Sequence, residues 1–186
     1  MLINNDTIIK DSNPLVREKS LEVSLPLSKE DEDLLLDMLT YVKESTDEEI
    51  AKEKNLSPAV GISAIQVGVK KKMMAIVIKD NDGNIKYQYA LVNPKLISYS
   101  LEKAYLKYGE GCLSVPEAHE GYVYRPARIK VRAYDVLEKK LVDIKVKDYL
   151  ALVFQHEMDH FDGVLYYDHI NKDNPFYEDP NAVVIE

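Results

Sequence analysis

The stretch His156-Glu157-Met158-Asp159-His160 stands near the end of an apolar run and decides how the chain is expected to fold. On a helix, His156 and His160 lie on one face, so their imidazoles can bind the same metal ion. Glu157 follows the first histidine directly, where its carboxylate can reach a metal-activated water without being a ligand itself. This H-E-x-x-H pattern therefore indicates a hydrolytic metal centre built on a helix.

The residues around this stretch predict where the helix begins and ends. Asp148 fits an N-cap and Gly163 fits a C-terminal stop, so we expect a helix over about 149–161. Leu152 and Val153 lie one turn before the first histidine on roughly the same face. The metal would therefore lie beside an apolar wall.

Composition limits the class of protein. With 186 residues, of which 46% are apolar and 30% charged, the chain can form one domain with a substantial core. Its formal charge of −8 argues against broad nucleic-acid binding, so we expect no direct nucleic-acid partner. The start resembles no signal peptide and the longest apolar run is too short to span a membrane, so we expect no membrane binding. A single cysteine excludes an internal disulfide, and a reducing cytoplasm is the expected location.

We expect the whole chain, 1–186, to be a single domain with an extended arm over 1–27 and a C-terminal tail over 164–186. A helix should begin after Ser28, which can cap it, because apolar residues follow at helical spacing as far as Val42.

Several short segments have the pattern of strands. The nearly continuous apolar run 73–78 is typical of a buried strand. The charged segment 46–54 indicates a solvated extra turn or a mobile insertion. The segment 59–68 has the pattern of a tight loop packed against a strand. Further strands are expected over 87–91 with an end at Asn93-Pro94, within 96–108, as a hairpin over 128–133 and 142–147, and at 182–186. The grouping of strands predicts an α+β fold, with antiparallel sheets packed around the central histidine-bearing helix and a second helix near the N-terminus.

The only cysteine lies in a glycine-rich loop, Gly109-Glu110-Gly111-Cys112-Leu113-Ser114. Its thiolate and the two imidazoles would make a three-ligand site with the fourth position open for water, whereas structural zinc sites usually fill all four. A free cysteine is commonly a small buried hydrophobic residue, and two histidines on a helix can be solvated side chains, so these interpretations stand beside the metal site. His119 and His169 are expected at the surface, because nothing in the sequence pairs them.

Three segments, in order, resemble the peptide deformylase family across nearly the whole chain. The G-x-G-x-[AS]-A-x-Q segment of the family corresponds to 59–66, its E-G-C-L-S segment to 110–114 and its H-E-x-D-H segment to 156–160. Ser63, the charged insertion and the non-helical tail resemble the subclass typical of Gram-positive bacteria. Ala59 departs from the pattern, because the family usually has glycine there and alanine resists a positive φ.

This resemblance implies a metal-dependent hydrolase that removes the N-formyl group from the N-terminal formylmethionine of newly synthesised polypeptides and releases formate. It implies that Cys112, His156 and His160 bind the metal. It also implies that Glu157 takes the proton of the attacking water and later delivers it to the departing amine.

The resemblance further implies how the substrate is held. The Gln66 side-chain amide and the Leu113 backbone N–H would donate to the formyl oxygen as it gains negative charge. The residues implied for peptide binding are Val60, Gly61 and Gly111 through the backbone, and Leu152, Val153 and His156 around the methionine side chain.

Ligand chemistry and family resemblance indicate different metals. Thiolate and imidazole ligands alone favour Zn²⁺. The resemblance implies one Fe²⁺ per chain, with Zn²⁺, Ni²⁺ or Co²⁺ as substitutes, and we expect Fe²⁺. It also implies N-formylmethionyl peptides as substrates and a transient contact with the ribosome.

Three other functions are compatible with parts of the sequence. A zinc metallopeptidase would need a further ligand downstream, and His169 is the only downstream histidine. A hydrolase with Cys112 as nucleophile would work without metal, so a chelator would distinguish the two. A non-catalytic metal or peptide-binding module would have no use for Gln66 and Glu157.

Overall fold

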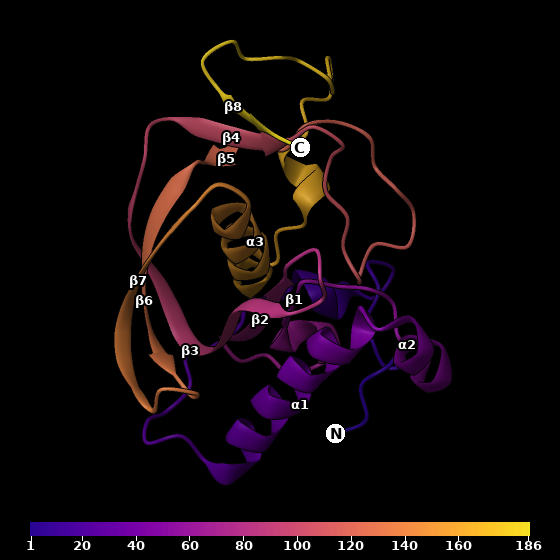
Figure 1. Ribbon diagram of the computed structural model, residues 1–186, viewed down its shortest axis with the longest axis vertical. Coiled ribbons are helices and arrows are strands. Elements are labelled where there is room, and N and C mark those ends of the chain that lie inside the picture. Colours follow the sequence, from indigo (N-terminus) through magenta and orange to yellow (C-terminus); the bar gives the residue numbers. More distant parts are fainter.

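The computed structural model describes residues 1–186 and contains two sheets and a central helix, α3 (Asp148–Asp159). The larger sheet has the order β1-β2-β3-β6-β7, with every neighbouring pair antiparallel. Its strands are β1 (Gly61–Ser63), β2 (Met73–Lys79), β3 (Ile85–Tyr99), β6 (Arg128–Asp135) and β7 (Lys140–Lys147). The smaller sheet has the order β5-β4-β8, with β4 (Lys103–Leu106), β5 (Arg125–Pro126) and β8 (Val183–Ile185). Figure 1 shows α3 between the curved larger sheet and the smaller one, which confirms the predicted α+β class.

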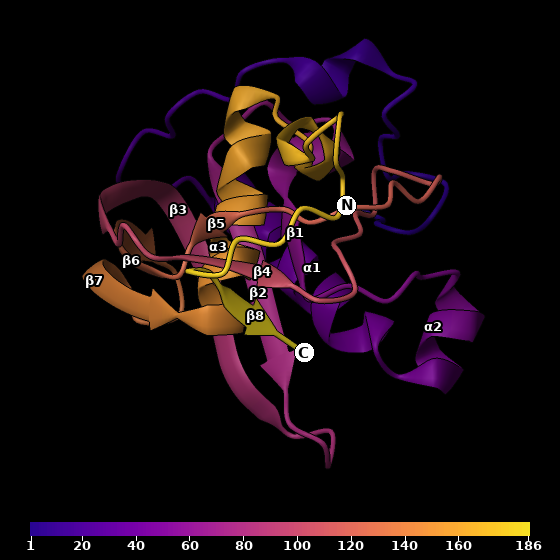
Figure 2. The ribbon, with the colours of Figure 1, turned by 90° about the horizontal axis from the view of Figure 1, so that it is seen from above.

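Two further helices lie on the other side of the larger sheet, as Figures 1 and 2 show. They are α1 (Lys29–Ser45) and α2 (Glu48–Lys54), and four short 3-10 turns complete the structure: η1 (Pro14–Arg17), η2 (Ala64–Val67), η3 (His160–Asp162) and η4 (Tyr166–His169). The Ser28 side chain accepts a hydrogen bond from the Asp31 N–H, so the predicted start of this helix is confirmed. None of the helices combines the length and the apolar character needed to cross a bilayer.

Strand β2 is apolar throughout because both of its faces are buried. Met73, Ala75 and Val77 belong to the core formed with α1, whereas Met74 and Ile76 belong to the core formed with α3. Burying a methionine, valine or isoleucine side chain contributes about 1.5–3 kcal/mol. The strand therefore fixes α3 relative to the rest of the molecule.

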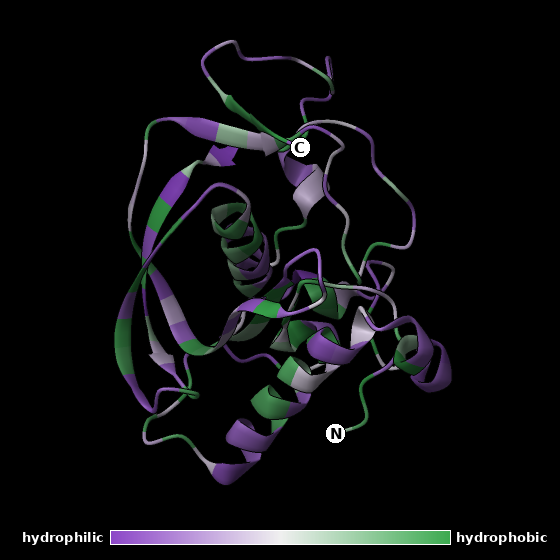
Figure 3. Ribbon diagram, in the orientation of Figure 1, coloured by the Kyte–Doolittle hydropathy of each residue, from purple (hydrophilic) through white to green (hydrophobic).

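The predicted hairpin is confirmed as β6 and β7, which pair from Arg128↔Lys147 to Asp135↔Lys140. Figure 3 shows hydrophilic and hydrophobic residues alternating along it, as expected when one face packs on a core and the other meets water. The predicted strand at the end of the chain is also present, as β8 beside β4 in parallel orientation.

The prediction that Asn93-Pro94 ends a strand is wrong. Strand β3 continues through both residues, with a shift of the pairing register between Val92 and Lys95 and a φ of 54° at Asn93. The Asn93 side chain exchanges two hydrogen bonds with the backbone of Val23, at 2.7 and 2.8 Å. The N-terminal segment thus pairs with a β-bulge, which is where a strand tolerates proline.

The predicted N-cap of α3 is also wrong. Strand β7 runs directly into the helix, so Lys147 occupies the N-cap position and Asp148 adopts a left-handed backbone with φ of 55°. The helix ends at Asp159 and continues as η3, and Gly163 with φ of 71° ends that turn as predicted.

The charged segment 46–54 forms the separate helix α2. The Asp47 side chain caps it by accepting from the Ile50 N–H at 3.0 Å, and only Ala51 is buried. A helix with one buried residue has no apolar stripe, so periodicity could not reveal it. The segment 59–68 contains more than a loop, since it includes the edge strand β1 and the turn η2.

The first residues of the chain fasten two segments that carry site residues. The Ile9 N–H donates to the Gln66 carbonyl and the Asp11 N–H to the Ser114 carbonyl, both at 2.7 Å. The Lys10 ammonium donates to the Leu113 carbonyl at 3.0 Å. The N-terminal segment therefore ties η2 to the cysteine loop.

Candidate active site

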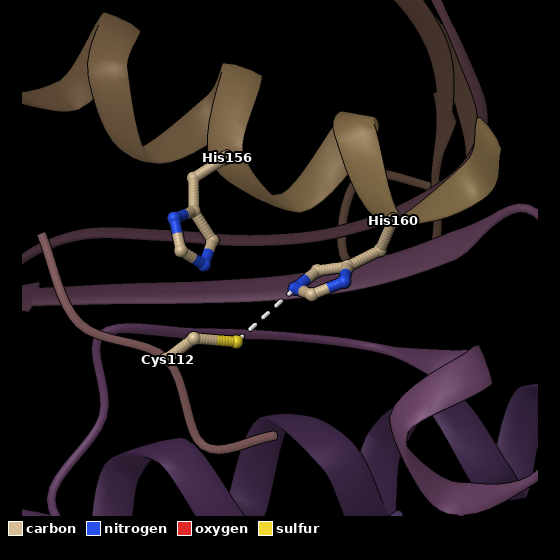
Figure 4. Close-up of side chains that lie close together, drawn as sticks. All are labelled: Cys112, His156 and His160. Carbon is tan, nitrogen blue, oxygen red and sulfur yellow. Dashed lines mark hydrogen bonds between the residues drawn. The ribbon is translucent and has the colours of Figure 1, made fainter. Parts of the chain in front are cut away.

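Cys112, His156 and His160 converge on one point, as Figure 4 shows. One ligand atom of each lies within 4.8 Å of the others, and the Cys112 Sγ is 3.5 Å from the His160 Nε2. His156 comes from the last turn of α3, His160 begins the turn η3 that follows it, and Cys112 comes from the loop between β4 and β5. The sequence analysis expected these three residues to meet at one site, and in the structure they lie together.

The donor set and its surroundings fit a divalent metal ion. Burial lowers the pKa of His160 to about 3, so its ring is neutral, as a metal ligand must be. The His160 Nδ1 is buried without a hydrogen-bond partner. The His156 Nδ1 lies 2.8 Å from the Glu110 Oε1, which leaves its Nε2 for a metal. A thiolate and two imidazoles suit zinc and other divalent transition metals.

A buried ionic network holds His156 through its Nδ1. Burial alone would raise the pKa of Glu110, but the hydrogen bond with His156 and the charge of Arg125 lower it to about 2. The Arg125 guanidinium donates to both Glu110 oxygens, at 2.9 and 3.0 Å, and to Asp159 at 2.7 Å. An ionised Glu110 can only accept, so it fixes the proton of His156 on Nδ1.

Sequence reasoning missed this network. Glu110 and Asp159 lie inside recognised motifs, but their partner Arg125 carries no sequence signal. His169 is exposed as expected, yet it is paired, with its Nε2 2.8 Å from Asp159. His119 is also exposed, and its ring stacks on Tyr167 at 4.0 Å between centroids.

Glu157 is buried beside strand β1, with 4% of its surface exposed. Burial raises the pKa of its carboxyl group. The Ser63 hydroxyl donates to the Glu157 carbonyl at 2.7 Å and lies 3.0 Å from the carboxylate Oε2. A Cβ at Gly61 would come within 2.9 Å of the Glu157 Cγ and Oε1, so only glycine leaves room for this carboxylate. The contacts of Ser63 and Gly61 with Glu157 were not foreseen from the sequence.

Gln66 and Leu113 lie next to the three converging side chains. The Gln66 Oε1 accepts from the Ser63 N–H at 2.9 Å, and its Nε2 donates to the Ser114 hydroxyl at 3.0 Å and lies 3.6 Å from the Cys112 Sγ. These bonds fix which end of the amide faces the cysteine. Leu113 follows the cysteine directly.

A cleft of about 690 Å³ opens over these residues. All the residues expected to bind substrate line it: Val60, Gly61, Gly111, Leu152, Val153 and His156. Gln66, Cys112, Leu113 and Glu157 line it as well. The other lining residues include Lys10, Leu106 and Tyr149, to which the sequence did not point.

Replacing Gly61 by alanine should lower kcat by up to about 10²-fold, because the new Cβ displaces the Glu157 carboxylate and misplacements of about 1 Å can cost this much. Steady-state hydrolysis by metal-loaded protein measures the effect. Ser63→Ala is the matched control in the same strand, since it removes a hydrogen bond but adds no atom beside Glu157. Equal kcat losses in the two variants would contradict the steric explanation.

Known proteins of one family are similar to this chain in sequence and in fold. The family model for polypeptide deformylase matches residues 5–176. The chain is 47% identical to peptide deformylase 2 of Bacillus subtilis over 185 residues and 44% identical to the peptide deformylase of Oceanobacillus iheyensis, with full coverage of each pair of chains. Among solved structures, a probable peptide deformylase from Synechococcus phage S-SSM7 has a TM-score of 0.68 and 31% identity, covering 88% of this chain and 98% of its own. The enzyme from Ehrlichia chaffeensis has a TM-score of 0.70 and 28% identity, covering 91% and 89%.

Ala59, the one departure from the family pattern, does not have a positive φ. The glycine usual at this position is thus not required for the backbone that precedes β1. The match over most of the chain and the convergence of Cys112, His156 and His160 lead to one conclusion: the chain belongs to the polypeptide deformylase family, the hydrolases that remove the N-formyl group from new polypeptides.

Proposed function

We propose that the chain carries out deformylation with Cys112, His156 and His160 as ligands of one divalent metal ion. The observation that carries this proposal is the convergence of their ligand atoms within 4.8 Å of one another beside the cleft. When bound, such an ion acidifies a coordinated water and polarises a carbonyl oxygen. Glu110 holds the imidazole of His156 in the orientation that this role requires.

Glu157 is the proposed proton carrier. It takes the proton of the attacking water and delivers it to the amine as the bond between the formyl carbon and the peptide nitrogen breaks. Its burial and raised pKa support this role, because a carboxylate with a raised pKa is a stronger base. The contacts with Ser63 and Gly61 keep the carboxylate in one position.

Gln66 and Leu113 are the proposed donors to the formyl oxygen. As the formyl carbon becomes tetrahedral, this oxygen gains negative charge, and each well-placed donor is worth about 3 kcal/mol. The Gln66 amide is already oriented by Ser63, with its NH₂ group toward the cysteine loop. Hydrogen bonds from Lys10 and Asp11 to the cysteine loop limit its movement around Leu113.

The cleft suits an extended peptide with an apolar first side chain. Strand β1 is at the edge of the larger sheet, so its free side can accept a further strand. We propose that the peptide pairs there with the backbone of Val60 and Gly61 and, across the cleft, with Gly111. The methionine side chain would then lie against Leu152, Val153 and His156, all of which line the cleft.

We propose Fe²⁺ as the physiological ion, with Zn²⁺, Ni²⁺ or Co²⁺ as substitutes. The donor set accepts all four, so the choice rests on the family resemblance. On the same ground we propose that the enzyme meets its substrates in transient contact with the ribosome. We also propose that it acts in the cytoplasm, because its single cysteine suits a reducing compartment.

Protein purified anaerobically with Fe²⁺ should release formate from a formyl-Met tripeptide and lose that activity when a chelator removes the ion. Formate is measured with a coupled formate dehydrogenase assay. A chelator-resistant hydrolysis that is lost on thiol alkylation would instead support Cys112 as a nucleophile. Cleavage of internal peptide bonds without formate release would support a peptidase.

A further inference from the structure

Lys10 lies on the wall of the active-site cleft, and its ammonium contacts the residue that follows Cys112. The ammonium donates to the Leu113 carbonyl at 3.0 Å, and this is its only hydrogen bond to the protein. The two acidic residues that line the cleft, Glu110 and Glu157, do not pair with it because both are bonded elsewhere. Lysine usually keeps its ammonium in water, so a partly buried lysine bonded only to an active-site carbonyl points to a role at the site.

The carbonyl that Lys10 holds belongs to a tight turn. The Val115 N–H donates to the Cys112 carbonyl at 3.0 Å, so Leu113 and Ser114 are the two central residues of a four-residue turn. The hydrogen bond that closes such a turn does not involve the peptide group between its central residues. The orientation of that group therefore depends on contacts from outside the turn, and at the Leu113 carbonyl this contact is Lys10.

The orientation of this turn matters because Leu113 is a proposed donor to the formyl oxygen. A donor of this kind must lie about 2.7–3.1 Å from the position of the charged oxygen, and a misplacement of about 1 Å can cost about 10²-fold in rate. The N–H and the carbonyl of Leu113 flank the same Cα, so a rotation of the residue moves both. A bond that holds the carbonyl thus also limits the movement of the N–H.

Lys10 extends from a part of the N-terminal segment that is fastened to the rest of the fold. The Asp11 N–H donates to the turn itself, and the Asp11 carboxylate accepts from the Tyr167 hydroxyl at 3.2 Å. The Tyr167 ring in turn stacks on the His119 ring, 4.0 Å away, and has the Arg17 guanidinium 5.4 Å from its centre. The ammonium of Lys10 is therefore held from a fixed backbone, as a positioning role requires.

We propose that Lys10 is a positioning residue for deformylation, which keeps the Leu113 N–H directed at the formyl oxygen through its bond to the Leu113 carbonyl. This inference rests on the proposed function of Leu113 as a donor. Lys10 acts through Leu113 and does not touch the substrate. Because the formyl oxygen gains its charge only in the transition state, the effect of Lys10 falls on kcat and not on KM. A lysine that only fastened the N-terminal segment would affect stability and leave kcat unchanged.

The first test compares three lysine variants in formate release from a formyl-Met tripeptide. Lys10→Met removes the donor and keeps an unbranched side chain, so kcat should fall about 10-fold, with KM changed less than about 2-fold. Lys10→Arg keeps a charged donor and should restore kcat to within about 3-fold of wild type. The matched control is Lys79→Met, because the partly buried Lys79 ammonium donates to the Lys43 carbonyl at 2.7 Å outside the cleft. This control should keep the wild-type kcat, and metal content should be the same in every protein.

A second measurement reports the orientation of Leu113 without turnover. In zinc-loaded protein with isotope-labelled leucine nitrogens, the amide signal of Leu113 is identified by its absence from the spectrum of Leu113→Met. Lys10→Met should shift or broaden this signal, whereas Lys10→Arg and Lys79→Met should leave it in place.

Four results would overturn the inference: an unchanged kcat or an unchanged Leu113 signal in Lys10→Met, an equal kcat loss in Lys79→Met, or a loss that Lys10→Arg does not restore. Loss of metal from Lys10→Met would also overturn it, because the effect would then lie at Cys112. A wild-type protein that releases no formate would overturn the proposed function instead, and the Leu113 signal would still decide whether Lys10 orients this residue.

Discussion

Replacing Glu157 by alanine should leave metal binding intact and lower kcat by about 10³-fold or more, within the range that general acid–base catalysis supplies. The residue lies next to the proposed ligand His156 but contributes no atom to the group of three proposed ligands. Its carboxylate is instead held by Ser63 at the buried edge of the cleft. Metal content by atomic spectroscopy and formate release by the same preparation test the two parts of the prediction together.

Glu157→Gln is the sharper variant, because it keeps the shape of the side chain. Its amide still fits against Gly61 and can still accept a hydrogen bond from Ser63, but it cannot take a proton. We therefore expect it to be as inactive as the alanine variant, with normal metal content. Activity within about tenfold of wild type in Glu157→Gln would remove proton transfer by this residue from the mechanism.

The features that sequence predicted well are those fixed by local chemistry. Two histidines four residues apart on an apolar helix must share a face, so the pair could be placed without knowing the fold. The run 73–78 was recognisable because a strand buried by α1 on one face and α3 on the other has no polar positions. The hairpin of β6 and β7 was predictable because apolar and charged residues alternate strictly along both strands.

The features that sequence missed depend on contacts between distant segments. Asn93-Pro94 has the pattern of a strand end, but hydrogen bonds between Asn93 and Val23 allow the strand to continue through a bulge. Asp148 reads as an N-cap, but β7 enters the helix without a loop, and its last residue takes that position. In both cases a local preference was overridden by pairing that only the folded chain contains.

The surroundings of the active site show the same division. The three proposed ligand residues lie in motifs, whereas Arg125 lies outside every motif and reaches Glu110 and Asp159 only because β5 runs beside α3. The contact of Gly61 with Glu157 is of the same kind, since the two residues are far apart in the sequence. Sequence patterns identify the groups that do the chemistry better than they identify the groups that hold them.

Replacing Arg125 by leucine should destabilise the protein by about 3–5 kcal/mol, the usual cost of removing one partner from a buried ion pair. The Arg125 side chain is 3% exposed and that of Glu110 is 5% exposed, so the glutamate would lose its counter-charge without gaining water. The same change should weaken metal binding about 10- to 100-fold, because Glu110 orients the proposed ligand His156. Urea denaturation of the metal-saturated protein and competition with a chelator measure the two effects.

Arg128→Leu is the matched control, since it removes the same charge from the neighbouring strand. The Arg128 and Glu102 side chains are 56% and 44% exposed, and water screens such a pair, so its loss should cost at most about 1 kcal/mol. Similar losses of stability in the two variants would mean that the buried ion pairs of Arg125 stabilise the fold no more than the exposed ion pair of Arg128. A stability loss in Arg125→Leu with unchanged metal affinity would mean that His156 keeps its orientation without an ionised Glu110. A loss of both stability and metal affinity in Arg125→Leu alone, as we expect, would show that one buried guanidinium, through Glu110, supports both the fold and the metal site.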